Sequence, residues 1–164
     1  MESLILLIAL SLSLTFARLT IFKGNLLDST DDYPWMAILS NKKGTCTASL
    51  VGMKKILTAA HCVLGNDLDE YYVFLGRSRV DFRSSKYFVI ERAMSEDYTS
   101  TSLVDGHDIS VLTLDREAKL EEWIKVARLD YGAVSPGTKL VVVGYGEDTS
   151  MSKSGDLKER NGSC

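Results

Sequence analysis

The sequence predicts an all-β protein built as an antiparallel barrel or sandwich. Short apolar runs recur along the chain, and polar turns containing Gly, Asn or Asp separate them. Many of these runs are rich in Val, Ile and aromatic residues, which favour strands. With 45% apolar and 25% charged residues among 164, the chain has the balance of a globular domain rather than of a disordered one.

Residues 1–17 are expected to be a secretory signal peptide. Leu4–Leu14 is an apolar run, and the segment ending at Ala17 resembles a signal-peptidase site, although Glu2 stands where a basic residue is usual. The alternative is a membrane anchor, but the run is shorter than the roughly 20 apolar residues that span a bilayer. We therefore expect a secreted, extracellular protein without membrane contact after cleavage before Arg18.

Six strands are predicted in the first two thirds of the chain. They are Trp35–Ser40, Thr45–Leu50, Lys55–Thr58, Tyr71–Leu75, Tyr87–Glu91 and Ile109–Leu114. A single helical turn is expected at Ala60–Leu64, directly after the third strand. Polar loops are expected at 67–70 and 95–106.

The last third is predicted to contain a linker, one strand and a tail. Leu120–Pro136 lacks periodicity and is expected to be the linker, whereas Thr138–Val143 reads as a strand that has no apolar neighbour to cover it. Such a strand predicts poor solubility or association. Residues 147–164 are polar and are expected to be a disordered tail, in which glycosylation of Asn161 is left open.

Two short motifs contain the candidate catalytic residues. His61 lies in Thr58-Ala59-Ala60-His61-Cys62, and Asp108 opens the apolar run Asp108-Ile109-Ser110-Val111-Leu112-Thr113-Leu114. Either residue alone has an ordinary structural alternative, a buried core histidine or an aspartate at a turn. Together the motifs resemble the trypsin/chymotrypsin-like serine protease family, whose histidine and aspartate lie in such motifs.

The resemblance implies a trypsin-like double Greek-key β-barrel, with the first barrel complete at about 21–118 and the second begun at about 137–146. It implies a secreted endopeptidase that hydrolyses peptide bonds of proteins or peptides through an acyl-enzyme. His61 would be the general base and acid, and Asp108 would orient it. Cys46 and Cys62 would form a disulfide, which an oxidising medium permits. Gly144-Tyr145-Gly146 resembles the family's Gly-Trp-Gly.

The family's nucleophile motif, Gly-Asp-Ser-Gly-Gly, is absent from the 164 residues, and the oxyanion hole and specificity pocket belong to the same stretch. The resemblance thus covers Ile21 to Gly146, and we expect a C-terminally truncated chain that is inactive by itself. The alternatives are a non-catalytic secreted homologue that acts as a binding protein, and a segment that folds with a second chain. Ile21–Asn25 resembles the family's mature N-terminus, but Thr20 precedes it, so the activation site is left open.

Other residues and ligands are less favoured. His107 neighbours Asp108, and adjacent strand residues point to opposite faces, so it is rejected as the base; Asp105 does not directly precede the apolar run. Two histidines and three cysteines without a paired Cys-x-x-Cys give no expected metal site, and no cofactor is predicted. A net charge of −3 predicts no nucleic-acid partner. The oligomeric state and the partner of Cys164 are not predicted.

Overall fold

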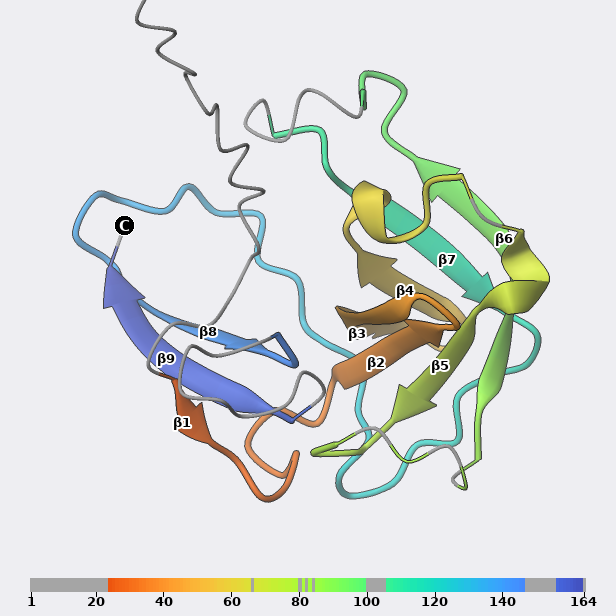
Figure 1. The fold of residues 1–164 in the computed structure, drawn as a ribbon. Coiled ribbons are helices and arrows are strands. Elements are labelled where there is room, and N and C mark those ends of the chain that lie inside the picture. The colour runs from red at the N-terminus through yellow and green to blue at the C-terminus, as the bar shows by residue number, and fades with distance from the viewer. Residues whose placement is uncertain are drawn as a thin grey trace, which may run out of the picture.

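The computed structural model describes residues 24–65, 67–79, 81, 83, 85–99, 106–146 and 156–163. In these residues, six strands close into a barrel, and a three-stranded sheet lies beside it (Figure 1). The predicted all-β class, with one complete barrel and a partial second one, is confirmed. The predicted signal peptide, Asp105 and Cys164 lie outside the described residues.

The barrel strands follow the predicted runs, with differences only at their ends. They are β2 (Met36–Asn41), β3 (Gly44–Gly52), β4 (Lys55–Thr58), β5 (Tyr72–Leu75), β6 (Tyr87–Met94) and β7 (Ser110–Leu114). All neighbours pair antiparallel, in the closed order β2-β3-β4-β7-β6-β5. A register shift between Val89 and Glu91 interrupts the β6–β7 ladder, and Ile90 at this irregularity is exposed.

Buried and more exposed side chains alternate along the strands, and the buried ones fill the barrel interior. On β7, Leu112 and Leu114 are fully buried, whereas Val111 and Thr113, which alternate with them, are half-buried. β2 differs because both of its faces are covered. Ala37 and Leu39 join the barrel core, and Met36 and Ile38 join a second apolar cluster that also contains Phe74, Tyr145 and Leu157. This double burial explains the uninterrupted apolar run of β2.

The second sheet has the order β1-β9-β8, formed by β1 (Asn25–Leu26), β9 (Lys158–Ser163) and β8 (Lys139–Gly144). The prediction of a disordered tail is wrong over residues 158–163, because these residues form β9. The polar segment pairs with β8 through backbone hydrogen bonds, which do not require apolar side chains. Leu157 anchors it in the second cluster, and Lys158 is also buried, with Nζ 3.2 Å from the Gly146 carbonyl oxygen.

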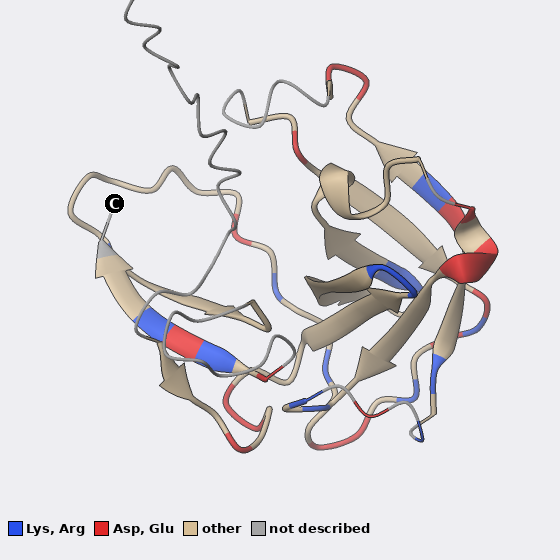
Figure 2. Cartoon of the chain, viewed as in Figure 1, with Lys and Arg blue, Asp and Glu red and all other residues tan. Residues whose placement is uncertain are grey.

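β8 is therefore paired on one edge, contrary to its expected isolation, although the side chains of Leu140, Val141 and Val142 are exposed. In the view of Figure 2, basic and acidic residues are interspersed, and Lys158, Glu159 and Arg160 alternate in sign along β9.

Two short 3-10 helices complete the described structure: η1 (Ala60–Cys62), at the predicted helical turn, and η2 (Leu68–Glu70), where a polar loop was expected. The linker after β7 contains no helix and hydrogen-bonds to the barrel, because Lys125 N–H donates to Pro34 and Ala127 N–H donates to Leu50. None of the helices in the described residues has the length and apolar character needed to cross a membrane.

Candidate active site

Strand pairing brings the two sequence motifs together. β4 and β7 run antiparallel, with Thr58 opposite Ser110 at the end of the ladder. The chain leaving β4 therefore lies beside the chain entering β7. Ala59 is still extended, and η1 then turns the backbone so that His61 and Cys62 lie above the barrel edge. Asp108, two residues before β7, meets them there.

The side chains of His61 and Asp108 form a two-point contact. His61 Nδ1 lies 2.7 Å from one carboxylate oxygen of Asp108, and the His61 backbone N–H donates to the other at 2.9 Å. Because an ionised carboxylate only accepts hydrogen bonds, Nδ1 carries the proton and Nε2 presents its lone pair. The His61 side chain is 39% exposed, whereas that of Asp108 is 16% exposed. Asp108 thus orients the imidazole from its more buried side, while the ring stays partly exposed to solvent.

The environment of Asp108 favours its ionised form. Burial acts to raise the pKa of this carboxyl, but the hydrogen bonds from the side chain and backbone of His61, the charge of His61 and the Ala60 backbone act in the opposite direction. Together they hold the pKa of Asp108 below its ordinary value. The carboxylate therefore stays ionised under the imidazole at neutral pH.

A disulfide fixes the other side of His61. Cys62 is bonded to Cys46 on β3, with an S–S distance of 2.06 Å, which confirms the expected pairing. Within the described residues, Cys46, His61 and Cys62 are the group whose potential metal-ligand atoms lie within 4.8 Å of one another. Both sulfurs are used by the disulfide, so this group offers a metal ion a single free nitrogen.

A cavity of about 270 Å³ opens at this cluster, and its lining includes His61, both cysteines, Lys43 and Tyr71. A larger cavity of about 640 Å³ is lined by Asp28, Arg77 and Trp123, among others, and shares no lining residue with it. Of the two cavities, the smaller one is therefore the one that reaches His61.

Of the two rival residues, the structure describes only His107. His107 Nδ1 is 3.9 Å from Asp97 in a solvent-exposed pair, and Asp105 lies outside the described residues. Sequence reasoning missed Tyr71, whose hydroxyl donates to the Cys62 carbonyl at 3.1 Å, and Tyr98, whose phenol pKa is raised by burial and by the charge of Asp108. No sequence signal marks these tyrosines, because their roles depend on strand pairing.

Comparisons with known proteins agree with this geometry. The family model described as Trypsin matches residues 24–163. The chain belongs to the trypsin family. Trypsin theta of Drosophila melanogaster is 32% identical over 116 residues, covering 70% of this chain and 44% of that protein. Human kallikrein-7 is 31% identical over 119 residues, covering 72% of this chain and 45% of that protein.

Solved structures show the same fold for this trypsin-family chain. Neuropsin, a serine protease of mouse brain, matches with a TM-score of 0.72 at 25% identity, over 86% of this chain and 63% of neuropsin. A scabies mite protein titled an inactivated protease paralogue matches with a TM-score of 0.75 at 22% identity, over 86% of this chain and 61% of its own. The chain spans less than half the length of the curated relatives named above.

Proposed function

We propose that this chain carries the general base and the orienting carboxylate of a secreted serine endopeptidase, and that by itself it does not hydrolyse peptide bonds. The observation that carries the proposal is the two-point contact between His61 and Asp108. It holds the imidazole with Nδ1 protonated and Nε2 unprotonated, as the removal of a proton from an alcohol requires.

The steps follow from that orientation. Nε2 of His61 takes the proton of a serine hydroxyl as its oxygen attacks the substrate carbonyl carbon, and Asp108 stabilises the resulting imidazolium. The imidazolium then gives this proton to the leaving amine, which leaves an acyl-enzyme for water to hydrolyse. The substrate would be a protein or peptide, in line with family membership.

Inactivity of the 164-residue chain follows from what it does not contain. The sequence has no Gly-Asp-Ser-Gly-Gly motif. Among the described residues, no serine or threonine hydroxyl hydrogen-bonds with His61; its ring contacts are Asp108 and Cys62. His61 therefore lacks both an alcohol nucleophile to deprotonate and the hydrogen-bond donors that stabilise the oxyanion of the tetrahedral intermediate.

A labelling experiment tests the inactivity of this chain. The purified chain is incubated with a fluorophosphonate probe, which reacts covalently with activated serines, and an intact trypsin-family protease serves as the positive control. We expect no label on the chain. A label that is lost in the His61→Ala variant would overturn the proposal that the chain is inactive.

A chimera tests the role of the two residues. Residues 18–146 are joined to the segment of a trypsin-family protease that contains Gly-Asp-Ser-Gly-Gly, and hydrolysis of a chromogenic peptide amide is measured. We expect activity that falls at least about a hundredfold in His61→Ala. The matched control is His107→Ala, which we expect to retain activity. Equal activity of the His61 and His107 variants would contradict the assignment of His61.

The second candidate function is a secreted, non-catalytic binding protein. It is favoured by the absence of the nucleophile motif together with a barrel that is closed and filled without it. Recovery of the chain as a stable secreted monomer that binds one defined partner would favour this function over the first.

A further inference from the structure

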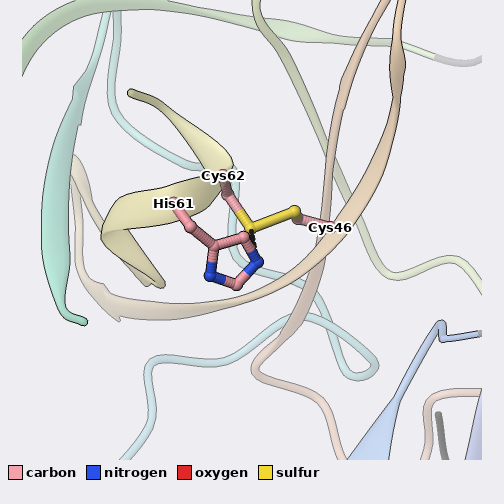
Figure 3. Close-up of side chains that lie close together, drawn as sticks. All are labelled: Cys46, His61 and Cys62. Atoms are coloured by element: carbon pink, nitrogen blue, oxygen red, sulfur yellow. Dashed lines mark hydrogen bonds between the residues drawn. A yellow bond between two sulfur atoms is a disulfide. The ribbon is translucent and has the colours of Figure 1, made fainter. Parts of the chain in front are cut away.

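The Cys46–Cys62 disulfide lies beside the His61 imidazole and is accessible from the same cavity. Both cysteines are only half-buried, and both line the cavity of about 270 Å³ that His61 also lines. A small molecule that enters this cavity therefore reaches the sulfurs and the imidazole together. Figure 3 shows the His61 ring lying against the disulfide.

The contact is directional. His61 Nε2 lies 3.4 Å from Cys62 Sγ, while Nδ1 is 2.7 Å from the Asp108 carboxylate (Figure 3 shows the first contact). Asp108 thus fixes which nitrogen faces the sulfur. Carboxylate, imidazole and Cys62 sulfur stand in series, in the order of a thiol–imidazole–carboxylate site.

We propose that Cys62 is a His61-activated thiol, and that the disulfide is a site of thiol–disulfide exchange with low-molecular-mass thiols. The attacking thiol bonds to Cys46 Sγ, the Cys46–Cys62 bond breaks, and its electron pair goes to Cys62 Sγ. The proton that the attacking thiol loses passes through solvent to Nε2, so that the Cys62 thiolate forms beside an imidazolium. A second thiol then attacks the bound one, so that two thiols become one disulfide and Cys46 leaves as a thiol.

Two physical effects support this direction of opening. Exchange is faster when the leaving sulfur is the better-stabilised thiolate, and an imidazolium beside it provides that stabilisation. Of the two cysteines in the described residues, Cys62 is the one whose sulfur lies 3.4 Å from His61 Nε2. After reduction, the Cys62 thiolate and the His61 imidazolium remain as an ion pair, and Asp108 holds the imidazolium in place.

Opening of the disulfide is the first measurement. The native full-length chain is treated with dithiothreitol near neutral pH, and loss of the Cys46–Cys62 bond is followed by quenching and mass spectrometry. We expect His61→Gln to slow the opening about tenfold. His107→Gln is the matched control, because His107 is the other histidine and pairs with Asp97 instead. Equal opening rates in the two variants would overturn the proposal.

Alkylation of the reduced chain is the second measurement. An ordinary thiol has a pKa of about 8.5 and is almost wholly protonated at about pH 5.5. We expect iodoacetamide at that pH to modify Cys62 about tenfold faster than Cys46, and this preference to disappear in His61→Gln. Mass spectrometry separates both from Cys164. Equal modification of Cys46 and Cys62 in the wild-type chain would overturn the proposal.

Within the described part of the chain, the other ionisable groups near the cluster are Asp108, Lys43 and Tyr71, with Tyr98 acting through Asp108. They are unchanged between the two histidine variants, so the comparison isolates the imidazole. Neither measurement needs a serine or peptide-bond hydrolysis. Failure of the protease proposal would therefore leave this one standing, and the reverse also holds.

Discussion

Replacing Asp108 with alanine tests whether the carboxylate holds the site together. The substitution removes the acceptor of three N–H groups: the side chain and backbone of His61 and the backbone of Ala60. Ala60 is fully buried, so its N–H loses an acceptor that water does not replace, at a cost of about 1–2 kcal/mol. The two donors of His61 reach solvent and add about 0.5 kcal/mol each. We expect a total loss of about 2–3 kcal/mol.

Urea unfolding of the oxidised chain at neutral pH measures this loss through the shift in midpoint. Asp97→Ala is the matched control, because Asp97 is an exposed carboxylate whose histidine partner is 3.9 Å away. We expect it to change the free energy of unfolding by less than about 0.5 kcal/mol. A free energy of unfolding for Asp108→Ala within that same range would refute the reasoning.

The same variant has a pH signature. The pKa of Asp108 is lower in the folded chain than its ordinary value, so the ionised group stabilises the fold above that ordinary value, about 3.9. This contribution is lost as the pH falls through the folded-state pKa. The gap between wild type and Asp108→Ala should therefore narrow in acid, and a gap that widens below about pH 4 would contradict the assignment.

Two further substitutions probe the sheet and the barrel core. The hydrogen bond to Glu159, with burial and nearby carboxylates, raises the pKa of Tyr33 to about 12. The protonated phenol therefore stabilises the fold below pH 10, and this stabilisation is lost as the pH rises through 12. In Glu159→Gln, one more tyrosine should ionise near pH 10 in an absorbance titration. Leu112→Ala should cost about 3 kcal/mol by urea unfolding because Leu112 is fully buried, whereas Leu120→Ala, at a site 46% exposed, should cost less than about 1 kcal/mol.

The barrel could be predicted because its strands carry their information in local patterns. Alternation on β7 and the closely spaced turns around β3 and β4 are visible in the sequence. β9 could not be predicted in this way. Lys158–Ser163 is polar, and its strand conformation results from backbone pairing with β8 and from a single anchor, Leu157. Pairing between segments so separated in the chain has no local signature.

The candidate site could be predicted from two short sequence motifs together with a family resemblance. Neither His61 nor Asp108 is distinctive alone, and the 2.7 Å contact between them follows from the register of β4 and β7. The approach of His61 Nε2 to Cys62 Sγ was not predicted either, because it depends on the orientation of the imidazole ring and not only on the adjacency of the two residues in the sequence. The side chains around His61 that come from other strands can be identified only when the strand pairing is known.

The two-sided burial of β2 links the barrel to the sheet beside it. Met36 and Ile38 cover Tyr145 and Leu157, while Ala37 and Leu39 face the barrel interior. Detachment of the sheet would expose one side of β2 and leave the other packed. Amide protons of β8 and β9 should thus exchange through a partial opening of lower free energy than the one that frees the barrel. The molecule would then unfold in two steps, the three-stranded sheet first and the barrel second.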